Sequence, residues 1–209
     1  MDWHRWHEAY EAPGSSLRQR LKVVQQQIGA ALDAAPAGPI RVISVCSGQG
    51  RDLLPVLATH PRRDEVAARL VELDPENAAV ARRSAEAANL TGVEVVVGDG
   101  GRTDAYRGAA PADLVLLCGV LGNISDADVR RTVDFCDQLC AAGGTLVWTR
   151  HRDAPDLVPQ ICDWLGERSF EQRWLSAPDA GYGVGVHRFT GEPRPLVAGE
   201  QLFTFIRES

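Results

Sequence analysis

Two closely spaced glycines, Gly48 and Gly50, follow the apolar run RVISVC and precede a predicted helix. Glycine tolerates positive φ and has no Cβ, so a ligand can lie directly against the backbone of such a turn. The start of the following helix adds unpaired N–H groups and a partial positive charge. The segment 42–50 therefore predicts a site for a nucleotide-like ligand, with a plain tight turn as the alternative.

Glu72 closes a second predicted strand, ARLVEL, with Leu73 beside it. In a doubly wound sheet this strand end lies next to the glycine turn, and an acid about twenty residues beyond such a turn can accept the hydroxyls of a ribose. The alternative is that Glu72 and Asp74 both cap the helix that begins at Pro75. Asp74 suits that position, whereas Glu72 comes too early, so the ribose role is favoured for Glu72.

Asp99 and Gly100 follow a third predicted strand, VEVVVG. A carboxylate there can accept the amino group of an adenine, and the Gly100 N–H can donate to a ring nitrogen. An ordinary Asp-Gly turn fits the same residues equally well. The three positions become informative only as an ordered set.

The elements around these turns alternate between strand and helix as far as residue 169. Such alternation predicts βαβ units and a parallel sheet, and the nearly all-apolar strands indicate cover on both faces. We expect the helix DADVRRTVDFCDQLCAA to stop at Gly143 and Gly144. After residue 169 three strands, FEQRWLSA, GVGVHRF and QLFTFI, follow with no helix between them.

Residues 1–38 form a separate region before the first strand. Leu17, Leu21, Val24, Ile28 and Leu32 recur at helical spacing, and Ser15 or Ser16 is the expected helix cap.

The ordered motifs resemble those of the class I S-adenosylmethionine (SAM) dependent methyltransferase family. VCSGQG is similar to the first motif, VELDPENAAVAR to the second and VVVGDG to the third. ADLVLLCGVLGNI resembles the fourth-strand motif and LCAAGGTLVWTR the fifth, so the resemblance covers residues 40–189. Within the family, GxGR and GxxxNxxDxxxRR resemble a poorly characterised bacterial group of small-molecule methyltransferase-like proteins.

The resemblance implies an α/β, Rossmann-like, doubly wound sheet of seven strands in the order 3-2-1-4-5-7-6. Strand 7 is then antiparallel, and N-terminal helices precede the sheet. SAM is the implied cofactor, bound by residues 39–209 and leaving S-adenosylhomocysteine (SAH) as product. The implied cofactor contacts are Cys46, Ser47, Gly48, Gln49, Gly50, Glu72, Leu73, Asp99, Gly100, Cys118 and Gly119.

Two positions depart from the family pattern. Ser44 stands where the first motif usually carries an acid, and Arg51 and Asp52 stand where a third glycine is common. The amino group of SAM then needs another acceptor, for which a backbone carbonyl near Cys46 or Gly119 is a candidate.

Residues beyond strands four and five are the candidates for chemistry on the acceptor. His151 is the best candidate for a general base, and Asn123 is a second catalytic candidate. Arg150 can hold an anionic substrate, although a solvated loop histidine and a surface arginine are equally compatible readings of these residues. Cys118 fits a small core thiol better than a nucleophile.

The N-terminal aromatic residues are a further group of interest. Trp3, Trp6, His7 and Tyr10 fall on one helical face. We interpret residues 1–38 as a helical lid that covers the site, with these four side chains on the substrate. A packing face or a homodimer contact is the alternative.

Composition limits the partners. The net charge of −6 argues against a general nucleic-acid binder, since phosphate binding needs a basic surface. The chain has no apolar run long enough for a membrane span and no signal core, and its five cysteines form no CxxC pair. We therefore expect a cytoplasmic enzyme for a small-molecule acceptor, without a metal.

Two other functions fit the same pattern. A nicotinamide-dependent oxidoreductase also uses a glycine turn and a later acid, but its third glycine is missing here and the helix-free tail fits it poorly. A non-catalytic SAM-binding or regulatory protein is the second alternative.

Overall fold

Strand β1 (Ile40–Val45) lies between β2 and β4 and is parallel to both. The sheet has the order β3-β2-β1-β4-β5-β7-β6, and β7 is antiparallel to both of its neighbours, which confirms the predicted topology. The computed structural model describes residues 15–206. The other strands are β2 (Val66–Glu72), β3 (Val93–Val97), β4 (Ala112–Leu117), β5 (Cys140–His151), β6 (Phe170–Leu175) and β7 (Tyr182–Phe189).

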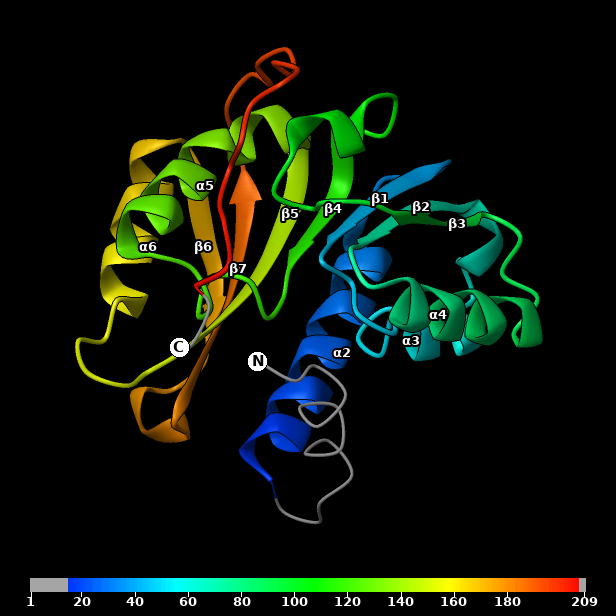
Figure 1. Cartoon of the computed structure of the whole chain (residues 1–209), viewed down its shortest axis with the longest axis horizontal. Coiled ribbons are helices and arrows are strands. Elements are labelled where there is room, and N and C mark those ends of the chain that lie inside the picture. The colour runs from blue at the N-terminus through cyan, green and yellow to red at the C-terminus, as the bar shows by residue number, and fades with distance from the viewer. Residues whose placement is uncertain (1–14, 207–209) are drawn as a thin grey trace.

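Helices cover both faces of this sheet (Figure 1). Helices α2, α3 and α4 pack on one face, and α5 and α6 pack on the other. Their bounds are α2 (Ser16–Ala34), α3 (Leu54–Thr59), α4 (Pro75–Ala87), α5 (Asp126–Leu139) and α6 (Val158–Glu167), with short 3-10 helices η1 (Arg63–Glu65), η2 (Thr103–Tyr106) and η3 (Pro178–Ala180). None of the described helices is long and apolar enough to cross a membrane.

Each face has its own apolar core because successive strand residues point to opposite sides of a sheet. On β1, Ile40 and Val42 join the core under α2, whereas Ile43 and Val45 join the core under α5. Both sides of β1 are therefore dry, and only its carboxyl end is free to meet a ligand.

Helix α2 follows the predicted apolar spacing. Ser15 caps it, and its hydroxyl accepts the Arg18 N–H at 3.1 Å. Val24, Ile28 and Leu32 are buried against the sheet, whereas Leu21 is only half-buried. The second half of α2 thus anchors the helix, and its first half extends past the sheet.

The predicted end of α5 at Gly143 is wrong, since the helix stops at Leu139. Cys140 already pairs with Ala112 of β4. The register between β4 and β5 then shifts, so that Leu114, the next paired residue of β4, lies opposite Thr145. Gly143 has φ +75° inside this shift, so it belongs to a β-bulge. A helix end and a bulge both use glycine at positive φ, which is why the sequence pattern misplaced the boundary.

Residues 201–206, predicted as a strand, lie outside the sheet. They end the segment 190–206, which we call the C-terminal strap and which runs back from β7 across the face that carries α5 (Figure 1). The strap forms only two isolated bridges, one to the loop after β3 and one to the loop after β4. Leu202 and Phe203 are buried, so the apolar residues reflect packing of an extended segment rather than a strand ladder.

Gly185 offers a test of the packing between β5 and β7. It lies opposite Trp148, and a Cβ at this position would fall 2.3–2.5 Å from three atoms of the buried indole. We expect Gly185→Ala to lower the free energy of unfolding by about 1–3 kcal/mol in urea titrations, because the packed core has no space for the added methyl group. Gly166→Ala is the control: nothing lies within 4 Å of its new Cβ, and alanine should raise helix stability by up to about 1 kcal/mol. Equal effects of the two changes would contradict this account.

Candidate functional site

Two adjoining cavities open where the carboxyl ends of β1, β2 and β4 meet. Cys46, Gly48, Cys118 and Gly119 line both of them. We call the first the Arg20 cavity and the second, which is the larger of the two, the Glu72 cavity. Both cavities lie at the position where open α/β sheets bind ligands.

The glycine turn forms the floor between the two cavities. Cys46, Gly48 and Gly50 have φ of 51°, 55° and 69°, so the chain curls sharply after β1. Of these three residues only Cys46 carries a side chain, and holding it at positive φ costs on the order of 1–3 kcal/mol. Its thiol fills the space beside Gly100, where a Cβ would come within 2.7 Å of the sulfur.

Burial keeps the thiols of the site protonated. Desolvation, followed by the charges of Glu72 and Asp99, raises the pKa of Cys46 well above its usual range. Desolvation likewise raises the pKa of Cys118. The nucleophilic form of cysteine is the thiolate. Because both thiols stay protonated, Cys46 and Cys118 serve in packing and not as nucleophiles.

Glu72 joins the end of β2 to the glycine turn. Its Oε2 accepts the Gly48 N–H at 2.7 Å, and its Oε1 accepts the Asp74 N–H at 2.9 Å. Each carboxylate oxygen has a second lone pair, so both can still accept a ligand hydroxyl. Burial raises the pKa of Glu72. Asp74 is the N-cap of α4, as predicted, and accepts the Glu76 N–H at 2.8 Å.

Leu73 and Phe205 also line the Glu72 cavity. Leu73 is 59% exposed although it is apolar. Phe205 comes from the C-terminal strap and was not predicted, because nothing in the sequence indicates that residues so far from the glycine turn return to it. The cavity therefore combines a buried carboxylate with two apolar side chains, the composition of a pocket for a sugar attached to a planar ring.

Asp52 and Arg20 in the Arg20 cavity were also missed. The helix predicted after the glycine turn, α3, begins only at Leu54, so Asp52 lies in the loop before it. There its carboxylate turns inward and accepts the Leu53 N–H at 2.8 Å and the Cys118 thiol. Desolvation raises the pKa of Asp52 to about 6. The signal that could have found it was the departure from glycine at this point of the turn.

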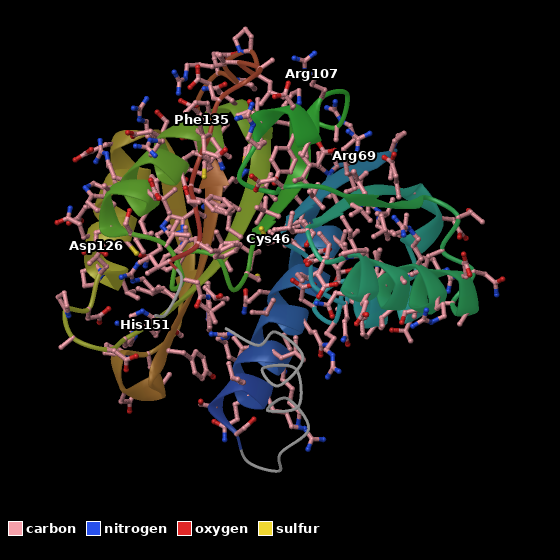
Figure 2. The ribbon with its side chains drawn as sticks, viewed as in Figure 1. Cys46, Arg69, Arg107, Asp126, Phe135 and His151 are labelled. Atoms are coloured by element: carbon pink, nitrogen blue, oxygen red, sulfur yellow. The ribbon has the colours of Figure 1, made fainter. Side chains whose placement is uncertain are left out.

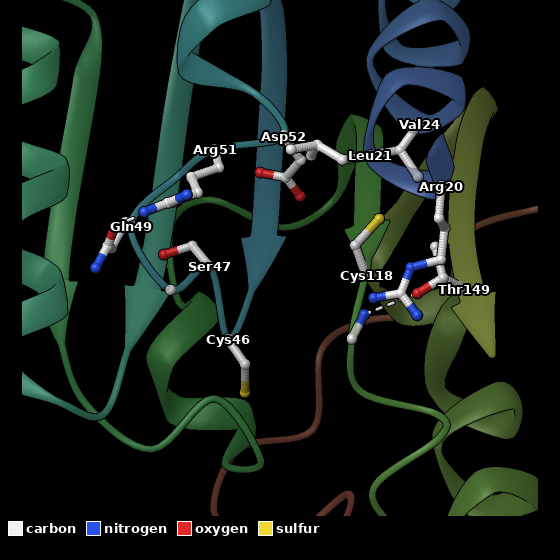
Figure 3. A pocket seen from close by; sticks show the side chains of 12 residues that line it. Arg20, Leu21, Val24, Cys46, Ser47, Gln49, Arg51, Asp52, Cys118 and Thr149 are labelled. Atoms are coloured by element: carbon white, nitrogen blue, oxygen red, sulfur yellow. Dashed lines mark hydrogen bonds between the residues drawn. The ribbon is translucent and has the colours of Figure 1, made fainter. Parts of the chain in front are cut away.

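Figure 3 shows this cavity from close by. Cys118 lies between the Asp52 carboxylate and the Arg20 guanidinium, which reaches in from α2 toward Thr149. The Thr149 hydroxyl accepts the Gly119 N–H at 2.8 Å and so fixes the turn after β4. Asp52 is thus the acidic side chain of the cavity, with Arg20 across Cys118 from it, and Arg51 also lines the cavity.

Most of the cofactor residues named from sequence do line the two cavities. They are Cys46, Ser47, Gly48, Gln49, Glu72, Leu73, Cys118 and Gly119. Gly50, Asp99 and Gly100 line neither of them. Asp99 is exposed, and its Oδ1 accepts the Gly101 N–H at 2.8 Å, which is the ordinary turn considered as its alternative.

The residues expected to act on an acceptor line neither cavity. Asn123 donates to the Gly119 carbonyl at 2.7 Å, so it holds the loop after β4. Arg150 is 6% exposed and donates to the Leu121 carbonyl and to Asp126 Oδ1, so its guanidinium is used inside the protein. Figure 2 shows His151 away from Cys46, toward the edge of the molecule. Its Nδ1 lies 3.4 Å from the exposed carboxylate of Asp153.

Two further expectations stand outside this geometry. Trp3, Trp6, His7 and Tyr10 lie outside the described residues. Among residues 15–206 there is no group of three or more His, Cys, Asp or Glu side chains that could hold a metal ion.

The burial of Asp52 predicts a pH-dependent gain in stability when its charge is removed. The pKa is about 6 in the folded protein against 3.8 for the free side chain, so the ionised carboxylate is a cost that is absent below about pH 4 and complete above about pH 6. We expect Asp52→Asn to raise the free energy of unfolding at about pH 7.5 by roughly 1–3 kcal/mol. The gain should shrink as the pH of the urea titrations falls toward about 4.

The exposed Asp163 of α6 provides the control, since Asp163→Asn should leave stability unchanged at every pH. A loss of stability in Asp52→Asn at neutral pH would show that folding requires the ionised carboxylate.

No family model matches the sequence, and no curated protein sequence matches it either. Solved structures do match its fold. An O-methyltransferase family protein from Burkholderia thailandensis aligns with a TM-score of 0.63 at 20% identity, over 88% of this chain and 57% of that one. The CurJ carbon methyltransferase aligns with a TM-score of 0.70 at 15% identity, over 91% and 59%.

The magnesium protoporphyrin IX methyltransferase ChlM from Synechocystis PCC 6803, which holds bound SAM, aligns with a TM-score of 0.65 at 13% identity. That alignment covers 89% of this chain and 90% of ChlM, whereas the chain spans less than three fifths of the other two proteins. The order and direction of the seven strands agree with these matches. The chain has the class I SAM-dependent methyltransferase fold.

Proposed function

We propose that this protein is a SAM-dependent methyltransferase that acts on a small-molecule acceptor through an oxygen, nitrogen or carboxylate. The observation that carries the proposal is Glu72. It is a buried carboxylate at the end of β2, hydrogen-bonded to the glycine turn and open to a cavity. An acid at this place in the fold suits the two hydroxyls of a ribose.

The residues around Glu72 fit the rest of an adenosine. Leu73 and Phe205 offer apolar contact to a planar ring, and the turn at Gly48 leaves room for the ligand beside the backbone. When bound, SAM supplies an electrophilic methyl group. The task of the chain is then to align that methyl with the acceptor atom in a dry pocket, which can contribute roughly 7–11 kcal/mol to lowering the barrier.

The proposal that the methyl acceptor is a small molecule rests on more general features of the chain. The net charge of −6 is unsuited to a polyanionic substrate such as nucleic acid. Protonated Cys46 and Cys118 serve the pocket wall, so the nucleophile comes from the substrate. This supports a small acceptor that binds beside the ends of β4 and β5.

The ribose assignment predicts the behaviour of Glu72→Ala. We expect this change to weaken SAH binding in calorimetry by at least about tenfold, because two charge-assisted hydrogen bonds are lost. Glu86→Ala, on the exposed side of α4, is the control and should bind SAH normally. NAD should neither bind nor raise the melting temperature. Unchanged SAH affinity in Glu72→Ala would overturn the assignment, and a response to NAD alone would favour an oxidoreductase.

We also propose that residues 1–38 act as a lid. Arg20, Leu21 and Val24 of α2 line the Arg20 cavity, which supports a covering role for the chain that leads into α2. We expect residues 1–20 to gain protection from amide exchange when SAM is added, because a closed lid would exclude solvent from their N–H groups. Unchanged exchange in this segment would refute the lid, and the peptide that contains β6 serves as an internal reference.

A further inference from the structure

Asp52 and Arg20 carry opposite charges in one cavity, and neither is paired within the described residues. Asp52 is 9% exposed, and its carboxylate accepts the Leu53 N–H, its own backbone N–H and the Cys118 thiol, none of which carries a positive charge. Arg20 forms no hydrogen bond or ion pair with any residue of the range 15–206. Both side chains nevertheless face the same space, on either side of Cys118 (Figure 3).

An unpaired buried carboxylate is costly, so proteins usually pair it with a cation or keep it for a ligand. Within residues 15–206 Arg20 and Asp52 form no ion pair with each other, although both line this cavity. A ligand between them would have to present a cation to one wall and an anion to the other. An α-amino acid group carries both charges on one carbon.

We infer that the Arg20 cavity binds an α-amino acid group, with Asp52 accepting hydrogen bonds from its ammonium and Arg20 donating to its carboxylate. This inference rests on the proposed function, in which the amino acid group is the methionine end of SAM. The two cavities adjoin, since Cys46, Gly48, Cys118 and Gly119 line both of them, and we infer that one molecule occupies both. Its ribose would lie at Glu72 and its amino acid group between Arg20 and Asp52.

The inference also accounts for the missing acid at Ser44. The sequence left a backbone carbonyl near Cys46 or Gly119 as the acceptor for the ammonium, and the Gly119 carbonyl has one lone pair left after accepting the Asn123 amide. A carboxylate gives roughly twice the hydrogen-bond strength of a neutral acceptor. Asp52, in the loop after the glycine turn, therefore takes the role of the acid that the family pattern places at the position of Ser44.

Two ligands that differ in the amino acid group distinguish binding of that group from a general effect on the shape of the pocket. SAH carries the amino acid group, whereas 5′-methylthioadenosine has the same adenosine without it. We expect Arg20→Met and Asp52→Asn each to weaken SAH binding by about tenfold to a hundredfold in calorimetry. The affinity for 5′-methylthioadenosine should change less than about twofold, since it makes no contact with the charged walls.

The matched controls are Arg18→Met on the exposed side of α2 and Asp163→Asn on α6, which should bind both ligands normally. Normal SAH affinity in both test variants would overturn the inference, as would an equal loss for both ligands. If the unchanged protein bound neither ligand, the proposed function itself would fail. Tight binding of free methionine that Arg20→Met abolished would assign the cavity to an amino-acid substrate instead of the cofactor.

Discussion

The hydrogen bond from the Gly48 N–H to the Glu72 carboxylate is the interaction on which the site depends. Parallel pairing sets Val45 beside Val71, so the chain leaves β1 and β2 at the same level. The turn at Gly48 then directs its N–H toward Glu72 at 2.7 Å. This bond fixes both the acid and the turn, and Gly48 lines both cavities.

The site differs from the rest of the molecule in the hydrogen-bond partners of its buried carboxylates. Away from the cavities, partly buried carboxylates have cation partners: Arg194 donates two hydrogen bonds of 2.8 Å to Asp137. At the cavities, Glu72 is held by backbone N–H groups, and Asp52 by two backbone N–H groups and a thiol. Burial raises the pKa of both acids. Acids kept in this state at a cleft are typical of binding sites, because a ligand supplies the missing partner.

The C-terminal strap completes the site from a distance. The Arg194 contacts hold its start on α5, the Leu202 N–H donates to the Gly101 carbonyl at 2.7 Å, and the Ile206 N–H donates to the Asn123 carbonyl at 2.9 Å. These bonds tie the strap to the loops that follow β3 and β4. As a result, Phe205 forms part of the wall of the Glu72 cavity.

Local patterns in the sequence, namely buried apolar strands, glycine turns and helix caps, predicted the alternating strands and helices of a parallel sheet. The order of the strands came from the resemblance of the ordered motifs to the class I family, and the structure has that order. The sequence also located the glycine turn and Glu72, which lie together because the strands that carry them are neighbours. It misjudged Gly143 and residues 201–206, where one local pattern serves two structures. Only the tertiary structure brought Arg20, Asp52 and Phe205 to the cavities and turned Arg150 and Asn123 inward, because these placements depend on packing between segments distant in the chain.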